Sequence, residues 1–539
     1  MRKGYDYIIL GGGSAGCVLA NRLSADPACS VLLVEAGPRD WDPLIRVPLM
    51  AGQFYRRSLH NWQYLTEPEP HLDNRRIEWP RGRVLGGSSA INGMVYTRGN
   101  RYDYDQWAQL GLRDWSYEKC LPYFRKFEDF EGGANDYHGA GGELPVTQPQ
   151  TQHRFYDIFH QAALDSGVPY NPDFNGEQQE GVGRYHSSIG RGERWSTARA
   201  FIDPVRERRN LDIVTGASVL KVTLDGARAT GVDLIANGLP AHIHADREVI
   251  VSCGAISSPT VLMHSGIGDA DDLKAAGVGV KVASKNVGRN LQDHLNVRMQ
   301  YAAKKEDALF GLRRFDRAGL AMARAILFKS GPATKFPLEG GAFIKSRPDV
   351  AAPDLQIHFT PGLSTANLRH PLQKKPANGI YEGYGFSANV CHLRPESRGS
   401  IKLKNSDPLD RPAIQANYLA AEGDRLAIRE GFKRLRALFQ QKAFDEIRGD
   451  EVLPGTTVKT DGDIDAYIRK NSGSIYHPVG TCRMGVDPES VVDEHLRVRG
   501  VDGLRVIDAS VMPNLVSANT NAPTIMIAEK GADYIRRAS

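Results

Sequence analysis

Cysteine is scarce in this sequence, and no two cysteines stand at CxxC spacing. The six are Cys17, Cys29, Cys120, Cys253, Cys391 and Cys482, scattered over 539 residues. Zinc sites and disulfide frameworks usually place cysteines at short recurrent spacings, so this pattern supports neither. We therefore expect no metal site, and a chain that works in a reducing compartment, the cytoplasm.

Long apolar runs and blocks of like charge are also missing. No uninterrupted apolar run reaches the ~18 residues of a membrane helix. The basic start at residues 1–3 resembles that of a signal peptide, but cleavage there would damage the motif that follows. The 68 basic and 63 acidic residues leave a net charge of only +5, which does not suggest a nucleic-acid partner.

The N-terminus has the order of elements of a dinucleotide-binding unit. An apolar run at Tyr5–Leu10 leads into GGGSAG at 11–16, a helical apolar spacing over 17–23, and a second apolar run at 31–34. Glu35 ends that run, 19 residues beyond Gly16. Strand, GxGxxG, helix, strand and acid are the features that this site requires.

Each part of this motif has a physical task. Gly11 makes the turn, Gly13 lets the pyrophosphate reach the helix N-terminus, and Gly16 allows the helix to pack closely on the strand. Glu35 can accept a hydrogen bond from the ribose, and its charge disfavours the 2′-phosphate of NADP. The motif itself does not separate NAD from FAD.

A second glycine-rich run, at 80–99, favours FAD. It places Gly82, Gly86, Gly87 and Gly93 around Ser88, Ser89 and Asn92 and has neither helical nor strand periodicity. Glycine allows close backbone approach, and the amides and hydroxyls supply hydrogen bonds. Although an ordinary surface loop could look similar, a second cradle suits the large flavin ring at the far end of an extended cofactor.

The rest of the chain predicts an α/β FAD-binding domain of Rossmann type with an inserted α+β substrate-binding cap. The FAD-binding domain is expected at 1–155, 196–300 and 475–539, and the cap at 156–195 and 301–474. Strands are expected at 211–214, 219–224, 249–252, 504–507, 355–359 and 400–403, and a helix at about 424–439. A mobile loop is expected at 363–380.

His477 and Asn521 are the candidate catalytic residues. His477 lies in YHPVGT, where Pro478 and Gly480 restrict the backbone, and Asn521 follows 44 residues later in NTNAPT. A neutral imidazole, with a reference pKa of about 6.5, is a usable base near neutrality. A lone histidine is more often structural, so the spacing leaves both interpretations open.

Six blocks in order resemble the glucose-methanol-choline (GMC) family of flavoprotein oxidoreductases. They are GGGSAG with Glu35, GRVLGGSSAIN, GAISSPTVLMHSGIG, VGRNLQDH, HPVGTCRMG, and VIDASVMP with NTNAPTIMIAEK. The overall sequence is most similar to the bacterial FAD-dependent alcohol dehydrogenases and choline dehydrogenase-like enzymes of that family. The resemblance implies the α/β fold, FAD as cofactor, and His477 and Asn521 as the catalytic pair.

The resemblance also implies a set of FAD-binding residues. Asn92, Gly93 and Val95 would contact the flavin ring, Val219 the adenine, and Asp508 with Ala509 the ribityl chain and ring edge. The remaining expected contacts are Gly11, Gly13, Ser14, Ala15, Gly16, Glu35, Ala36, Arg83, Gly87, Ser88, Met94 and Pro523. Some members bind the flavin covalently through a histidine at the position of Ile91, so we expect dissociable FAD here.

The predicted function is oxidation of a primary alcohol to the aldehyde, with electrons passed to a quinone or another carrier. His477 would take the hydroxyl proton, and Asn521 would stabilise the developing alkoxide. The alternatives are an oxygen-using oxidase, a hydroxynitrile lyase-like enzyme and a non-catalytic FAD-binding protein. Ile475, above the flavin, is expected to hinder oxygen, while oligomeric state and peripheral membrane association stay open. The candidate pocket aromatics are Phe359, Tyr381, Tyr384 and Phe386, although alternation in strands favours core packing for half of them.

Overall fold

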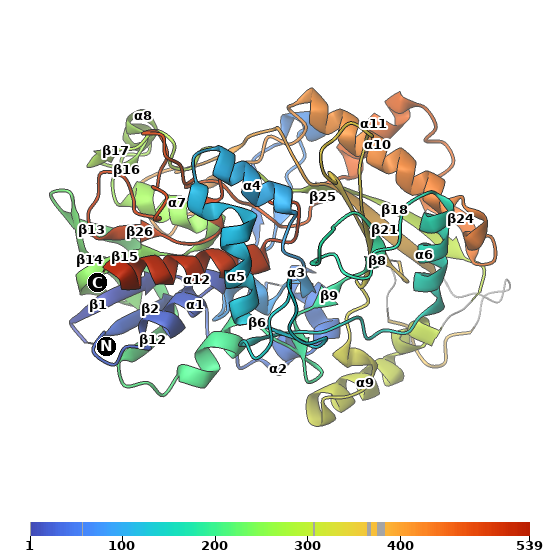
Figure 1. The fold of residues 1–539 in the computed structure, drawn as a ribbon, viewed down its shortest axis with the longest axis horizontal. Coiled ribbons are helices and arrows are strands. Elements are labelled where there is room, and N and C mark those ends of the chain that lie inside the picture. The colour runs from blue at the N-terminus through green and yellow to red at the C-terminus, as the bar shows by residue number, and fades with distance from the viewer. Residues whose placement is uncertain (1, 57, 306–307, 364–367, 375–382, 539) are drawn as a thin grey trace.

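The chain forms two lobes, each built around a seven-stranded sheet (Figure 1). The computed structural model describes residues 2–56, 58–305, 308–363, 368–374 and 383–538. We call the sheet near the N-terminus the first sheet and the other the second sheet. Both chain termini lie in the lobe of the first sheet.

The first sheet has the strand order β12-β2-β1-β15-β14-β13, with β26 pairing with β15. Its strands are β1 (Gly4–Leu10), β2 (Val31–Glu35), β12 (Leu211–Thr215), β13 (Ala217–Asp225), β14 (Arg228–Ala236), β15 (Leu239–Val251) and β26 (Leu504–Val506). β12, β2, β1, the end of β15 and β26 run parallel, while β13, β14 and the start of β15 form an antiparallel meander. The parallel pairings confirm the dinucleotide-binding order predicted at the N-terminus.

Helices cover the parallel part of the first sheet, so its strands are buried on both faces. All five residues of β2 are buried, as are the last four of β1. The helices α1 (Ser14–Leu23) and α12 (Asn521–Ala538) lie side by side on this sheet, and α7 (Gly254–His264) follows β15 (Figure 1). The first and last helices of the chain therefore meet beside the glycine-rich turn.

The second sheet is antiparallel, with the order β24-β18-β21-β20-β19-β8 and β25 pairing with β18. Its strands are β8 (Gly181–Arg184), β18 (Leu295–Ala303), β19 (Gly340–Ile344), β20 (Leu355–Thr360), β21 (Gly385–His392), β24 (Arg448–Leu453) and β25 (Gly473–Ser474). Helix α10 (Glu422–Phe439) packs against β21, which confirms the helix predicted at 424–439. Helices α6 (Arg154–Asp165) and α11 (Asp461–Asn471) lie in the same lobe (Figure 1).

The remaining elements are six helices and six pairs of short strands among the described residues. The helices are α2 (Pro43–Arg46), α3 (Ala51–Arg56), α4 (Arg101–Gln109), α5 (Tyr117–Phe127), α8 (Ala270–Ala275) and α9 (Phe315–Phe328). The strand pairs are β3 (Tyr64–Leu65) with β4 (Glu78–Trp79), β5 (Val95–Tyr96) with β9 (His186–Ser187), β6 (Glu128–Phe130) with β7 (Leu144–Val146), β10 (Ile189–Gly190) with β11 (Glu193–Arg194), β16 (Ile267–Gly268) with β17 (Val282–Ala283), and β22 (Ser400–Lys402) with β23 (Ala413–Gln415). Within the described ranges, no helix is both long and apolar enough to cross a membrane.

Three expectations about the cap differ from the structure or fall partly outside the described residues. The predicted boundary at residue 300 falls inside β18, which pairs with β21 from Asn296 to Ala302. Phe359 and Phe386 are fully buried among other rings of the second lobe, so they belong to its core and do not line the cavity. Tyr384 is buried as well, whereas Tyr381 and much of the predicted 363–380 loop lie outside the described residues.

Candidate functional site

A cavity of about 940 Å³ lies between the two sheets. Its walls come from the carboxyl ends of β1 and β2, from β13 and α7, and from β18, β20 and β21 of the second sheet. In α/β sheets, ligands bind outside the carboxyl ends of the strands. The cavity has the place and size of a site for a large cofactor together with a substrate.

Most of the predicted site residues line this cavity. They are Gly11, Gly13, Ser14, Ala15, Glu35, Ala36, Arg83, Gly87, Ser88, Asn92, Gly93, Met94, Val95, Val219, Asp508, Ala509, His477 and Asn521. Ile91 and Ile475 line it as well. Gly16 and Pro523 do not, because Gly16 faces the first strand and Pro523 is buried near the start of α12.

The glycines at the cavity floor fit a cofactor that lies against the backbone. A Cβ on Gly16 would stand 1.9 Å from the Gly11 carbonyl oxygen, so only glycine lets α1 pack this closely on β1. A Cβ on Gly87, whose φ is +54°, would stand 2.7 Å from the Gly13 Cα. The two glycine-rich runs are therefore in contact, and together they leave the N-terminus of α1 open to an anion such as a pyrophosphate.

Two buried carboxylates, Glu35 and Asp508, lie at or just beyond the carboxyl ends of parallel strands. Glu35, at the end of β2, accepts hydrogen bonds from the Gly12 N–H at 2.9 Å and the Gly37 N–H at 2.7 Å. Burial raises the pKa of Glu35 to about 7. Asp508, two residues beyond β26, accepts from the Gly254 N–H at 2.8 Å, and burial raises its pKa.

Asn92 has a fixed orientation. Its Oδ1 accepts from the Met94 N–H at 3.1 Å and from Arg194 Nη1 at 2.7 Å. The amide NH₂ is therefore the group that it can offer to a ligand in the cavity. The sequence did not point to Arg194, which is 102 residues away and fully buried.

His477 is fixed by its backbone. It follows β25, and its N–H donates to Asp293 Oδ1 at 2.7 Å. Asp293 in turn accepts from the hydroxyls of Ser474 and Tyr418. A buried, fully bonded carboxylate thus holds the loop that carries His477 against the cavity.

A second histidine sets the tautomer of His477. The Nδ1 atoms of His294 and His477 are 3.0 Å apart, and His294 Nε2 lies 3.1 Å from the Leu393 carbonyl oxygen. Because a carbonyl only accepts, His294 Nε2 carries the proton and its Nδ1 has a lone pair. His477 Nδ1–H must then donate to His294, which leaves the lone pair of His477 on Nε2.

The other ring nitrogen of His477 faces Asn519. Asn519 Nδ2 lies 3.2 Å from His477 Nε2, and its Oδ1 accepts from Thr97 Oγ1 at 3.0 Å. This amide orientation makes Asn519 a donor to His477, in agreement with the tautomer above. Asn521, the predicted partner, instead accepts from Ser14 Oγ at 2.7 Å through its Oδ1.

Burial keeps the two histidines neutral. It lowers the pKa of His477 well below 6.5, and the neighbouring His294 and Arg81 act in the same direction. It lowers the pKa of His294 to about 3. At neutral pH, His477 therefore presents an unprotonated Nε2 next to the cavity.

Sequence reasoning missed His294, Asp293 and Asn519 as site residues. His294 and Asp293 end the motif VGRNLQDH, and Asn519 begins NTNAPT, so the motifs did contain a signal. Which of their side chains meet His477 depends on the fold, because His294 and His477 are 183 residues apart.

The second sheet contributes polar side chains to the cavity. They are Asn296, Arg298, His358, Thr360, Ser387 and Asn389, from β18, β20 and β21. None of these six is a carboxylate or a phenyl, phenol or indole ring. A quaternary ammonium is usually recognised by an aromatic cage or a carboxylate. These six residues offer neither, and the aromatic rings that line the cavity, Trp62, Tyr64 and Tyr476, come from other segments.

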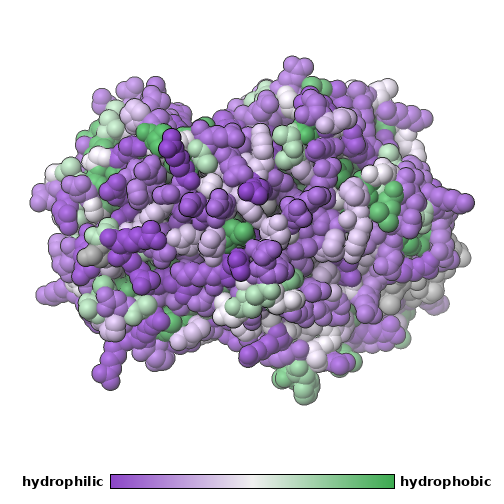
Figure 2. Space-filling model, viewed as in Figure 1, coloured by the Kyte–Doolittle hydropathy of each residue, from purple (hydrophilic) through white to green (hydrophobic). Residues whose placement is uncertain are grey.

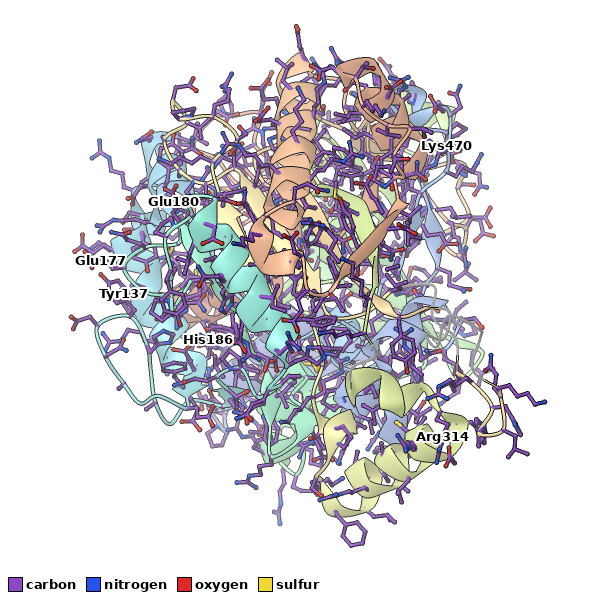
Figure 3. The ribbon with its side chains drawn as sticks, turned by 90° about the vertical axis from the view of Figure 1, so that its right-hand side faces the viewer. Tyr137, Glu177, Glu180, His186, Arg314 and Lys470 are labelled. Carbon is purple, nitrogen blue, oxygen red and sulfur yellow. The ribbon has the colours of Figure 1, made fainter. Side chains whose placement is uncertain are left out.

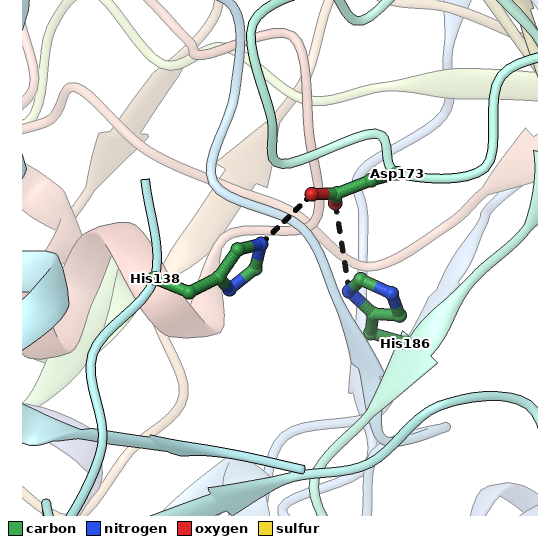
Figure 4. Close-up of side chains that lie close together, drawn as sticks. All are labelled: His138, Asp173 and His186. Carbon is green, nitrogen blue, oxygen red and sulfur yellow. Dashed lines mark hydrogen bonds and ion pairs between the residues drawn. The ribbon is translucent and has the colours of Figure 1, made fainter. Parts of the chain in front are cut away.

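A separate cluster of titratable side chains, which includes His186, lies away from the cavity, on the face that Figure 3 turns toward the viewer. His138 Nε2 lies 2.9 Å from Asp173 Oδ2 (Figure 4). The other ring nitrogen, Nδ1, lies 3.1 Å from Glu128 Oε1. His186 Nδ1 is 3.7 Å from Asp173 Oδ1. Although His138, Asp173 and His186 are close enough to share a metal ion, both ring nitrogens of His138 already have carboxylate partners. The geometry is that of a buried ion-pair network.

Comparisons with known proteins agree with this site. Residues 5–296 and 395–528 match the two parts of the GMC oxidoreductase family. The chain is 44% identical to an alcohol dehydrogenase [acceptor] of Pseudomonas putida, over 99% of this chain and 96% of that protein. It is 44% identical to the mitochondrial choline dehydrogenase of Homo sapiens, over 99% of this chain and 90% of that protein.

A solved structure with a related sequence is pyridoxine 4-oxidase from Mesorbium loti. It is 33% identical, covers 99% of both chains and superposes with a TM-score of 0.87. Formate oxidase, at 26% identity, superposes with a TM-score of 0.90 over 100% of this chain and 99% of that chain.

Proposed function

The chain belongs to the GMC oxidoreductase family of FAD-binding enzymes that act on CH–OH donors, and on that premise we propose that it oxidises a primary alcohol to the aldehyde. The observation that carries the proposal is the unprotonated Nε2 of His477 at the cavity wall. Bound FAD would supply the hydride acceptor. We propose that the cavity residues named above hold it, without a bond to Ile91.

The chain's own groups would then handle the proton. A substrate hydroxyl donates to His477 Nε2 and replaces the Asn519 NH₂ there. Asn519 and Asn521 both have their Oδ1 bonded to the protein, so each can turn its NH₂ to the substrate oxygen. As the hydroxyl proton moves to Nε2, the charge on the imidazole strengthens the bond from Nδ1–H to His294.

The cavity wall favours an uncharged alcohol over choline. Arg298 is the charged side chain among the six that the second sheet contributes, and a cation beside it would be repelled. The relatives named as choline dehydrogenases belong to the same family, and the aromatic rings that line this cavity, Trp62, Tyr64 and Tyr476, lie outside the second sheet that carries Arg298. We propose that electrons pass to a quinone or another carrier, in line with the relative named alcohol dehydrogenase [acceptor].

Anaerobic flavin reduction tests the proposal. Purified holoenzyme is mixed with ethanol, hexanol, benzyl alcohol, pyridoxine and choline, and flavin absorbance is followed before oxygen or a quinone is added. We expect bleaching by uncharged primary alcohols, weak bleaching by choline, and faster reoxidation by the quinone. An enzyme that binds FAD but is not reduced by any of the alcohols would point to lyase chemistry and overturn the proposal.

The matched variants are His477→Ala and His244→Ala. His477→Ala should retain FAD and lose turnover by at least about 10²-fold, the usual contribution of a general base. His244, at 53% side-chain exposure, lies on the first sheet away from the cavity and should be neutral. Equal turnover in the two variants would remove His477 from the mechanism.

A further inference from the structure

The face of the second sheet that looks onto the cavity is polar along three adjacent strands. The side chains of β18, β20 and β21 that line the cavity are Asn296, Arg298, His358, Thr360, Ser387 and Asn389. The residues that alternate with them, among them Met299, Phe359 and Ala388, are apolar and buried on the opposite face of the sheet. We call the six cavity residues the polar wall.

The polar wall differs from an ordinary polar surface because it lies inside the protein. Polar side chains on the outside bond to water, and most of the surface drawn in Figure 2 is hydrophilic in this way. In the polar wall, His358 and Ser387 are buried and the other four residues are half-buried. His358 Nδ1 has no hydrogen-bond partner among the described residues. A buried polar atom without a partner costs free energy, so a ligand that bonds to this wall gains affinity.

The register of the sheet brings the members of the polar wall side by side. Asn389 on β21 pairs with Arg298 on β18 and with His358 on β20, and Ser387 pairs with Thr360. The Cβ atoms of paired residues lie about 5 Å apart on the same face of a sheet. The polar wall is therefore continuous, and one small molecule can contact several of its side chains.

The polar wall offers donors and acceptors next to one another. Asn389 Oδ1 accepts from Arg298 Nε at 2.9 Å, so the NH₂ of Asn389 is the group that can donate to a ligand. Asn296 Nδ2 donates to a backbone carbonyl of β25 at 2.8 Å, which leaves its Oδ1 to accept. Ser387 Oγ donates to a backbone carbonyl at 2.7 Å, which leaves its lone pairs to accept. A hydroxyl both donates and accepts, so it matches this mixture better than a carboxylate, which only accepts.

The polar wall begins close to the proposed reacting centre. Gln356, also on β20, donates through Nε2 to Asn519 Oδ1 at 3.4 Å, and Asn519 contacts His477. His358 and Thr360 follow on the same face of β20, in steps of about 6.7 Å. A second polar group on the substrate would therefore meet the wall several bonds away from the hydroxyl that His477 deprotonates.

We propose that the substrate is a primary alcohol with a second, uncharged hydroxyl, and that the polar wall binds this second hydroxyl. The inference rests on the proposed function and specifies its substrate class. A plain alkyl chain would cover the wall without bonding to it and leave its polar groups without partners. The carbon atoms of a diol also find apolar contacts, because Leu338 and Leu363 line the cavity.

Two alcohols of equal size test this requirement. Pentane-1,5-diol and hexan-1-ol have the same number of non-hydrogen atoms, and burial alone favours hexan-1-ol. We expect the second-order rate constant of anaerobic flavin reduction to be at least about tenfold higher for the diol, which exceeds the factor of two from its two equivalent hydroxyls. An equal or higher rate constant for hexan-1-ol would overturn the inference and leave the proposed function intact, since the flavin is reduced in either case.

Binding is measured apart from catalysis in the holoenzyme of His477→Ala, whose flavin should be reduced slowly. Each ligand is titrated, and the change in flavin absorbance gives its Kd. We expect the Kd of the diol to be at least about tenfold lower than that of hexan-1-ol. Equal Kd values would overturn the inference even if no alcohol reduces the flavin of the parent protein, a result that would overturn the proposed function. Tighter binding of 5-hydroxypentanoate than of the diol would assign the wall to carboxylates and overturn an uncharged second hydroxyl.

The matched variants are Thr360→Val and Thr223→Val. Valine has the shape of threonine without the hydroxyl, so Thr360→Val should lower the ratio of the diol rate constant to the hexan-1-ol rate constant about threefold or more. Asn389→Leu, which removes a donor of the polar wall, should lower this ratio as well. Thr223 lies on β13 outside the lining of the cavity, and its variant should keep the ratio of the parent protein. Because the ratio is taken within each variant, a general loss of activity does not change it. An unchanged ratio in both Thr360→Val and Asn389→Leu would overturn the inference.

Discussion

His294 Nδ1 accepts a hydrogen bond from His477 Nδ1, 3.0 Å away, in the interior of the protein. The two rings are nearly perpendicular, at 85°, with centroids 5.3 Å apart. Because His294 Nε2 must donate to the Leu393 carbonyl, the donor and the acceptor of the hydrogen bond between the two histidines are determined as well. The protein thus selects the tautomer of His477 before any substrate arrives.

The first prediction concerns this pair. His294→Leu removes the acceptor and leaves a buried N–H of His477 without a partner, so the tautomer is no longer fixed. We expect kcat/KM to fall about 10- to 100-fold, or about 1.4–2.8 kcal/mol, with FAD content unchanged. His294→Asn, which can keep an acceptor, should recover part of the loss. If both variants fall equally, the role of His294 is packing alone.

Asn519 supports the second prediction. Its NH₂ meets His477 Nε2 in the absence of substrate and is placed to follow the oxygen of a bound alcohol. Asn519→Ala should lower kcat about 10- to 100-fold through loss of a donor to the developing alkoxide. Asn519→Asp should be worse, because a carboxylate cannot donate and would raise the pKa of His477. Steady-state kinetics at saturating alcohol measure kcat for both variants. Values of kcat equal to that of the parent protein would contradict this assignment.

Local motifs could be predicted from the sequence because neighbouring residues determine them. The strand, turn and helix from Gly4 to Leu23 follow from an apolar run and glycine spacing, and the strand and the helix were found where predicted. The contact of His294 with His477 could not be predicted, since it depends on how β18 and the loop after β25 are placed. The motifs identified the right segments but not the meeting side chains.

Helix α9 shows a different limit. Its apolar residues occur on both the buried and the exposed face, so no single stripe at helical spacing marks it in the sequence. Of the four candidate pocket aromatics, Phe359 and Phe386 lie in the core, a role that strand alternation favours for half of them. Alternation in β20 and β21 does not say which side of the sheet faces the cavity.

The third prediction is a loss of stability in acid. Burial lowers the pKa of His294 to about 3 and that of His358 to about 4, whereas an unfolded histidine has a pKa of about 6.5. Below pH 6.5 the unfolded chain therefore binds more protons, and folding is destabilised as the pH falls. For each of the two residues, the free energy of unfolding should be about 2 kcal/mol lower at pH 5 than at pH 7.

His358→Leu isolates one of these residues. His358 Nδ1 is buried without a hydrogen-bond partner, so its removal should cost little at pH 7. The fall in Tm between pH 7 and pH 5 should shrink by about 2 °C relative to the parent protein. An unchanged fall in Tm would mean that His358 is not the neutral, buried group proposed.

His138 should behave in the opposite sense, and this is the fourth prediction. Burial alone would lower the pKa of His138, but its hydrogen bonds to Asp173 and Glu128 outweigh burial and raise it. A raised pKa contributes stability that is complete below pH 6.5 and is lost as the pH rises through the folded pKa. His138→Gln should therefore lower Tm more at pH 6 than at pH 9.

The control for His138 is His242, whose Nδ1 contacts Asp233 Oδ1 at 2.8 Å on the surface. Its side chain is 56% exposed, and exposed pairs contribute little, so His242→Gln should change Tm by less than about 1 °C at either pH. His138 differs because it lies between two carboxylates, Glu128 and Asp173, and Glu128 is fully buried and would keep only Arg98 as a cationic partner. Differential scanning calorimetry at the two pH values measures the contrast. A deficit for His138→Gln that is the same at pH 6 and pH 9 would show that the ring acts by shape, and it would contradict a charged His138 between the two carboxylates.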